Sequence, residues 1–265
     1  MAAITSQRDL REVRDLPFCH VCGLSLSAHD DFNHDHVPPQ TCFDKSDRNP
    51  PLKLRTHIAC NNENKLNDEK VGELIAAQRN KTVDPTQTRL RIELMHDTRT
   101  GRQYAGFENL DVSGAIRRWV GGFHAALYRQ PLIPGTPFQV TAPLPHAKVI
   151  GQDVVIQPIP PQHAAFVQTL KLNRAAGNLD LVSTSNGKLR YETVWAQEDK
   201  GSRWFCIFAL NLYDWIGLGD TRNFEPRGCV GSYMLHSADV PLAASRVTRI
   251  QAPIQNDFPH DPFAS

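Results

Sequence analysis

The chain has 265 residues, of which 40% are hydrophobic and 22% charged, a composition typical of a globular protein with a substantial core. The formal net charge is +1, which excludes binding of nucleic acid through overall charge and leaves only local basic patches for that role. The sequence contains no apolar run near the roughly 20 residues of a membrane helix, and residues 1–18 lack the apolar segment of a secretory signal. We therefore expect a cytoplasmic protein without membrane association.

The first region of the chain, residues 1–78, contains two pairs of metal-ligating residues. Cys19 and Cys22 form a C-x-x-C, His57 and Cys60 form an H-x-x-C, and 34 residues separate the pairs. In a reducing compartment this spacing indicates a metal rather than disulfides, and two such pairs on tight turns are typical of structural zinc. The alternative is a redox-active C-x-x-C beside an unrelated histidine and cysteine, but nothing nearby has the βαβ pattern of a thioredoxin-like protein. We predict Zn²⁺ bound by all four residues.

Between the two pairs lies the sequence NHDHVPP, residues 33–39, which is rich in groups that bind metals and transfer protons. Hydrolysis of a phosphodiester requires a base that activates water and a divalent cation that carries charge at the phosphate. A neutral histidine such as His36 suits the base near pH 7. The oxygens of Asp35 and Asn61 are hard ligands suited to Mg²⁺ or Mn²⁺. The zinc site would bring Asp35 and Asn61 to opposite sides of one such ion.

The role of His34 has two interpretations. Strand alternation places His34 and His36 on one face and Asp35 on the other, unless the chain bends before Pro38. His34 is then a supporting or phosphate-contacting group, or it only faces solvent. We expect His20, next to the first zinc ligand, to be a surface residue.

The combination of CxxC, DHVPP and HxxCNN followed by a charged helix resembles the HNH endonuclease family, which has the ββα-metal fold. The resemblance covers residues 17 to about 78 and is closest to the branch whose strand ends in acid-His-Val-Pro-Pro. It implies a zinc-stapled hairpin plus helix that cuts DNA with one catalytic divalent ion. It also implies that His36 is the general base, that Asp35 is a metal ligand, and that Asn61 is the second ligand, from the helix.

The sequence departs from the family pattern at three positions. The family's middle asparagine, which steadies the catalytic histidine, is replaced here by Leu52, and Asn49 is the nearby candidate. The third zinc ligand is histidine rather than the commoner cysteine, which zinc accepts. The lysine usually three residues after the helix asparagine falls at Lys65, in register with Asn62 rather than Asn61. Asn62 is therefore a rival ligand of the catalytic ion.

Basic residues in and after this motif are the expected DNA contacts. Lysine and arginine bind the phosphate backbone without reading base sequence, and the alternative is an ordinary solvated face. Residues 79–105 are predicted to be a basic linker, since six Lys or Arg and three acids lie between Arg79 and Arg102. The predicted DNA-binding residues are Arg48, Lys53, Arg55 and Lys65 within the motif, with Arg79, Lys81, Arg89 and Arg91 after it.

The remaining elements are predicted from periodicity and turn residues. Asn67-Asp68-Glu69 has the pattern of a helix cap. Residues 112–130 and 160–178 predict two helices from their three-to-four spacing of apolar residues and from prolines at a start. Asn186-Gly187, between two extended runs, predicts a hairpin turn, and residues 203–213, apolar on both faces, predict a central buried strand.

Three further expectations concern the remaining cysteines, the C-terminal tail and the polar residues after the buried strand. Cys42, Cys206 and Cys229 are expected to be buried neutral thiols. The Pro-rich tail is expected to be an arm or a disordered end. Several polar residues follow the buried strand, and they either line a ligand pocket or belong to an ordinary loop. These residues are Asp214, Asp220, Glu225 and Arg227.

The sequence thus predicts an α+β protein with an N-terminal zinc-stapled ββα-metal (HNH) domain at 1–78 and a basic linker at 79–105. An α+β accessory domain with an antiparallel sheet and helices follows at 106–236, and a C-terminal tail at 237–265. The expected function is Mg²⁺- or Mn²⁺-dependent DNA cleavage, in the phage-defence or mobile-element setting usual for such nucleases. Expected partners are DNA and a second copy in a homodimer. The alternatives are a non-catalytic zinc finger that binds nucleic acid or protein, and a nuclease silent until its C-terminal domain is engaged.

Overall fold

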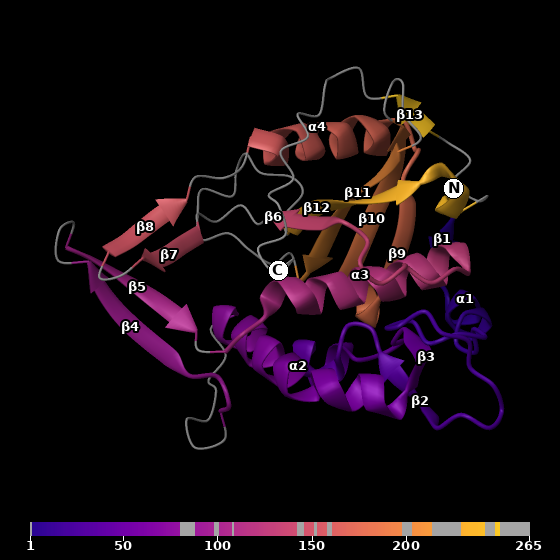
Figure 1. The fold of residues 1–265 in the computed structure, drawn as a ribbon, viewed down its shortest axis with the longest axis horizontal. Coiled ribbons are helices and arrows are strands. Elements are labelled where there is room, and N and C mark those ends of the chain that lie inside the picture. The colour runs from indigo at the N-terminus through magenta and orange to yellow at the C-terminus, as the bar shows by residue number, and fades with distance from the viewer. Residues whose placement is uncertain are drawn as a thin grey trace.

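The computed structural model describes residues 2–79, 88–97, 101–107, 109–141, 146–150, 153–157, 161–197, 203–213, 229–241 and 247–249. The described part is a mixed α+β structure with a large sheet, as the sequence predicts (Figure 1). Its α-helices are α1 (Gln7–Glu12), α2 (Ile58–Gln78), α3 (Val112–Tyr128) and α4 (Pro161–Ala175). The strands of the large sheet are β1 (Ala3–Ile4), β6 (Phe138–Thr141), β9 (Asp180–Thr184), β10 (Leu189–Gln197), β11 (Arg203–Leu212), β12 (Cys229–His236) and β13 (Val247–Arg249). Three separate hairpins are β2 (Phe32–His36) with β3 (Lys53–His57), β4 (Ile92–Asp97) with β5 (Arg102–Phe107), and β7 (His146–Ile150) with β8 (Asp153–Gln157).

The large sheet has the order β1-β9-β10-β11-β12-β6, and β13 pairs with β10. The pairings from β9 to β6 are antiparallel, whereas β1 runs parallel to β9 and β13 parallel to β10. The predicted central strand is confirmed, because β11 lies between β10 and β12 and is almost entirely buried. The predicted hairpin turn is also confirmed: Asn186 and Gly187 have φ values of 54° and 76°, a conformation these two residue types adopt at low cost.

Two helices cover opposite faces of the sheet (Figure 1). Helix α4 packs through Phe166 and Leu170 against one face, in a cluster that includes Ile207 of β11. Helix α3 packs on the other face, where Trp119 belongs to a larger cluster with Phe208. Because side chains alternate along a strand, β11 supplies residues to both clusters, Ile207 to one and Phe208 to the other. Both predicted helices are confirmed at nearly their predicted bounds.

The N-terminal segment lies against the side of α3 that faces away from the sheet (Figure 1). Strand β2 pairs antiparallel with β3, and α2 follows β3 without a gap. Leu54 of β3 and Ile75 of α2 belong to the same buried cluster as the residues of α3 and the sheet. The regions predicted as separate domains therefore share one continuous core, and the boundary at residue 78 stays a prediction.

Three elements differ from the sequence-based expectations. Helix α2 begins at Ile58, directly after β3, so the cap predicted at Asn67 is wrong; Asn67 lies within the helix and exchanges two hydrogen bonds with the backbone of Asp111, which caps α3. The segment predicted as a basic linker contains the hairpin β4–β5. The tail contributes β13 to the sheet. Among the described helices, none combines the length and the apolar character needed to cross a bilayer.

Candidate metal centre and catalytic residues

Two tight turns, here called the first and second knuckles, present the predicted zinc ligands. The first knuckle carries Cys19 and Cys22, and its turn closes through a 2.8 Å hydrogen bond from Gly23 N to Cys19 O. Gly23 has a φ of 78°, the left-handed conformation that glycine adopts without strain. The second knuckle is the junction of β3 and α2, where His57 precedes the helix and Cys60 lies in its first turn.

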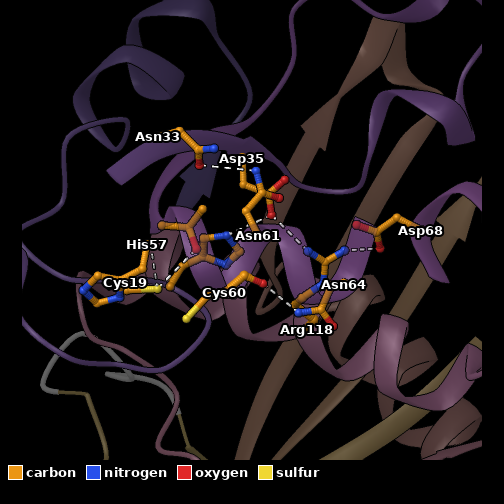
Figure 2. Close-up of polar contacts among 11 residues, drawn as sticks. Cys19, Asn33, Asp35, His57, Cys60, Asn61, Asn64, Asp68 and Arg118 are labelled. Atoms are coloured by element: carbon orange, nitrogen blue, oxygen red, sulfur yellow. Dashed lines mark hydrogen bonds and ion pairs between the residues drawn. The ribbon is translucent and has the colours of Figure 1, made fainter. Parts of the chain in front are cut away.

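The knuckles bring all four predicted zinc ligands together. The Sγ atoms of Cys19, Cys22 and Cys60 and a ring nitrogen of His57 lie within 4.8 Å of one another. Figure 2 shows three of these residues, Cys19, His57 and Cys60. This Cys3His set can hold a metal ion, and it is the donor set that structural zinc uses. Cys19 is fully buried, while the other three are partly exposed, so the site sits at the edge of the core.

The thiol groups of the cluster differ in how readily they ionise. Burial opposes ionisation of Cys19, but hydrogen bonds from the Thr56 hydroxyl and from backbone amides outweigh it and lower its pKa to about 6. Burial and the negative charges of Cys19 and Cys22 raise the pKa of Cys60 to about 12. One thiolate therefore forms readily and opposes the next. A divalent ion among the sulfurs removes that repulsion, since metal ligands must be deprotonated.

Asp35 is buried inside the protein, in contact with two basic side chains. Its Oδ2 lies 3.1 Å from Nη1 of Arg118 on α3 and 3.3 Å from Nε2 of His20 on the first knuckle. Arg118 also pairs with Asp68 of α2, so the guanidinium bridges two carboxylates (Figure 2). His20 is only 3% exposed, so its expected surface position is wrong. Its backbone N–H donates to Arg55 O.

His36 and His34 lie on the opposite face of β2 from Asp35, as strand alternation predicts. A 2.9 Å hydrogen bond joins Nε2 of His36 to the side-chain nitrogen of Gln40, and because an amide N–H donates, the imidazole nitrogen accepts. Burial, followed by the positive charge of Lys53 opposite it in β3, lowers the pKa of His36 to about 4. His36 is therefore neutral at pH 7. His34 donates to Asp15 at 2.9 Å.

The asparagines predicted as ligand and support residues differ in their placement. Asn61 is partly buried on α2 and donates to the side-chain oxygen of Asn33 on β2 at 3.3 Å (Figure 2). Asn62 is exposed. Asn49 is also exposed, while Leu52, in the position of the family's middle asparagine, is buried in the core.

The predicted DNA-contacting residues are distributed over the surface of the N-terminal segment. Arg55 lies over the ring of Phe32 and pairs with Asp15, and Arg48 donates to a backbone carbonyl. Arg79 pairs with Asp44 at 2.6 Å. The placements of the others are as follows: Lys53 partly buried, Lys65, Arg89 and Arg91 exposed, and Lys81 outside the described residues, as are Asp214, Asp220, Glu225 and Arg227.

The sequence did not single out Arg118 or Asp68 as functional residues, although a signal was present. Arg118 falls on the helix face that carries Ala115 and Gly122, and Asp68 falls on the stripe of Val71 and Ile75. A charged residue on a helix face otherwise made of apolar residues requires a partner when that face is buried. Once the two helices are known to be neighbours, the buried arginine and the buried aspartate are therefore expected to pair with each other.

The predicted catalytic residues, including the proposed ligands of Mg²⁺ or Mn²⁺, all have side-chain partners in this arrangement. Asp35, His36 and Asn61 each contact a different side chain, and within the described residues no hydrogen bond joins any two of them. The charge of Asp35 is already balanced by Arg118. A cation at Asp35 would lie beside a guanidinium, and like charges at that distance repel strongly in a buried site.

Comparison of the chain with protein-family models, with curated proteins and with solved structures finds no match in any of the three.

Proposed function

We propose that the chain is a metal-dependent endonuclease of the HNH type that hydrolyses DNA phosphodiester bonds, with a zinc ion as a structural staple. The observation that carries the proposal is the order of parts along the chain. The first knuckle is followed by β2 ending in His36, then by β3, the second knuckle and α2. A pure zinc finger needs no histidine at the end of the paired strand and no acid beside it.

His36 is neutral and can accept a proton, as a general base for water activation must. Its neutral form accepts a proton at Nε2, the atom that now accepts from Gln40, so an attacking water would replace the Gln40 amide there. Its lowered pKa keeps the imidazole neutral throughout the physiological range. The resemblance assigns Asp35 and Asn61 to a Mg²⁺ or Mn²⁺ ion, which would stabilise negative charge on the phosphate. Both side chains would first have to leave their present partners.

A non-catalytic zinc module that binds nucleic acid or protein is the second candidate. The specific observation in its favour is that Asp35 is buried, in an ion pair with Arg118 and in contact with His20. Such a triad stabilises the packing of α3 on the hairpin without any catalysis. The two candidates differ in whether Asp35 ever contacts a cation.

A plasmid-nicking assay with the full-length, zinc-loaded protein separates the candidates. Supercoiled plasmid is incubated with Mg²⁺, Mn²⁺ or EDTA, and zinc content is measured in each sample afterwards. The nuclease proposal predicts nicked or linear DNA with Mg²⁺ or Mn²⁺, loss of cleavage in EDTA while zinc is retained, and recovery when Mg²⁺ is added back. Zinc-containing protein that binds plasmid but leaves it intact in every sample contradicts the proposal. Light scattering on the same sample tests the proposed homodimer.

A further inference from the structure

Arg118 holds the place that a catalytic cation would take at Asp35. Its guanidinium contacts Asp35 of β2 through Nη1 and Asp68 of α2 through Nη2, and all three side chains are at least nine-tenths buried. The arginine comes from α3, which belongs to the region predicted as the accessory domain. One residue of that region therefore joins the strand and the helix that the nuclease proposal assigns to cation binding (Figure 2).

The contacts of Arg118 and of a divalent ion exclude each other. Asp35 is a hard oxygen ligand, and a cation that binds it is repelled by a guanidinium 3.1 Å away. The cation can be held by Asp35 only when the arginine has moved.

The structure contains space into which Arg118 can move. Beside the guanidinium lies a cavity of ≈ 180 Å³, lined in part by His20, Asn64, Arg117 and Arg118 itself. Nε of Arg118 is buried and has no hydrogen-bond partner within the described part of the chain. Residues of α3, of the first knuckle and of α2 line this cavity. A small shift of α3, or a change of the arginine side chain alone, would carry the guanidinium from Asp35 toward this space while Asp68 still holds it.

We propose that Arg118 is a regulatory residue that blocks the catalytic cation site at Asp35, so that the accessory region controls cation binding through the position of α3. This inference rests on the proposed nuclease function. It gives a structural basis for a nuclease that is silent until its C-terminal region is engaged. It also accounts for the mismatch between the predicted cation ligands and their observed contacts.

The test measures Mn²⁺ binding to the zinc-loaded, full-length protein by electron paramagnetic resonance. Arg118→Met removes the charge and keeps the bulk of the stem, and Arg117→Met is the matched control, because Arg117 is the adjacent arginine of α3 and donates to Thr136 O. We expect Arg118→Met to bind Mn²⁺ about tenfold tighter or more, a coupling of ordinary size between two sites. Arg117→Met should bind as the wild type does.

A second set of variants identifies the ligands in the Arg118→Met background. Adding Asp35→Asn or Asn61→Ala should abolish the gain if the unblocked site is the proposed one. A gain that survives Asn61→Ala but is lost with Asp68→Asn would mean that removing the arginine only created an acidic pair, and it would overturn the inference. Should Arg118→Met fail to fold, Arg118→Lys replaces it. A lysine cannot bridge two carboxylates as a guanidinium does, so it should give a smaller gain of the same sign.

The outcome for this inference is independent of the outcome for the nuclease. Tighter Mn²⁺ binding that needs Asp35 and Asn61 supports the block, even if no variant cuts DNA, in which case the nuclease proposal alone fails. If the wild type cuts plasmid and Arg118→Met binds Mn²⁺ no more tightly, the inference fails and the nuclease stands. If both hold, Arg118→Met should cut plasmid at about a tenth of the Mn²⁺ concentration that the wild type requires, which is the same coupling seen in cleavage.

Discussion

At the scale of single residues, a buried histidine in the core of the accessory region has a lowered pKa. His124 of α3 is 1% exposed, and its Nδ1 shares a 2.8 Å hydrogen bond with the hydroxyl of Tyr233. The rings of Tyr128 and Trp195 pack edge-on around it. Burial lowers the pKa of His124 to about 3, because the charged imidazole has no water there.

This histidine makes the fold less stable in acid. In the unfolded chain its pKa is about 6.5, so between pH 6.5 and 3 only the unfolded state is protonated. The stabilising contribution is complete above pH 6.5 and is lost as the pH falls, by roughly 2 kcal/mol at pH 5. We expect His124→Gln, which does not titrate, to lose less stability than the wild type between pH 7 and 5. Urea unfolding of the zinc-loaded proteins at both pH values measures this, and equal pH dependences would contradict it.

The choice between Asn61 and Asn62 as cation ligand also belongs to the residue scale. Asn61 faces the hairpin through its contact with Asn33, whereas Asn62 is exposed. We expect Asn61→Ala to raise the Mg²⁺ concentration needed for cleavage, and Asn62→Ala to leave it nearly unchanged. Titration of Mg²⁺ in the nicking assay gives both values. The reverse ranking would move the ligand to Asn62, in register with Lys65.

At the scale of elements, we propose that zinc bound between the two knuckles holds the hairpin β2–β3 and α2 in place. Structural zinc sites contribute on the order of 10 kcal/mol to the segments that bind them. We expect Cys60→Ser to lose the zinc and to make the N-terminal segment sensitive to protease. Cys42→Ser is the matched control, because this buried cysteine lies outside the cluster and should change packing without changing zinc content. Elemental analysis measures the zinc content of the two variants, and limited proteolysis measures their sensitivity to protease. A stable, protease-resistant Cys60→Ser variant without zinc would contradict the proposed structural role of zinc.

The contact of α3 with the end of the hairpin depends on a single glycine. A Cβ added at Gly122 would lie 2.7 Å from Cγ1 of Val37, whereas one added at Gly121 would meet nothing closer than 3.7 Å. We therefore expect Gly122→Ala to destabilise the protein by about 1–3 kcal/mol through overpacking. Gly121→Ala should be neutral or stabilising by up to about 1 kcal/mol, because alanine favours a helix more than glycine does. Thermal unfolding of the pair tests this, and equal melting temperatures would show that α3 does not press on the hairpin.

At the scale of the whole molecule, the local parts of the structure could be predicted from the sequence. The periodicity of 112–130 and 160–178, the Asn186-Gly187 turn and the doubly apolar strand each depend on residues that are neighbours in the chain. The Cys3His cluster could also be predicted, because the spacing of each pair is itself local and zinc chemistry supplies the connection between them.

The long-range parts could not be predicted in this way. The tie between the chain's start and the sheet depends on Asp180, which accepts from Ala2 N at 2.6 Å and from the Tyr128 hydroxyl at 2.9 Å. No sequence pattern near Ala2, Tyr128 or Asp180 predicts these hydrogen bonds. The packing of α3 against the N-terminal segment is of the same kind, and Arg118 reaches Asp35 across 83 positions of sequence. The amino-acid composition differs between the two regions, so the sequence predicts two domains. Their shared core is built from residues that are far apart in sequence, and composition along the chain does not reveal such contacts.

The proposed role of His36 as the base that activates water for DNA cleavage is tested most directly by comparing two histidines of β2. Single-turnover nicking of a plasmid is measured for the wild type, His36→Ala and His34→Ala, with DNA binding and zinc content measured in parallel. Loss of a general base typically costs about 10²- to 10⁴-fold in rate. We expect a loss of that size for His36→Ala with binding and zinc unchanged. We expect a much smaller effect for His34→Ala, which loses a hydrogen bond to Asp15 and a ring contact with Phe32. Equal cleavage rates for the wild type and His36→Ala would contradict the account.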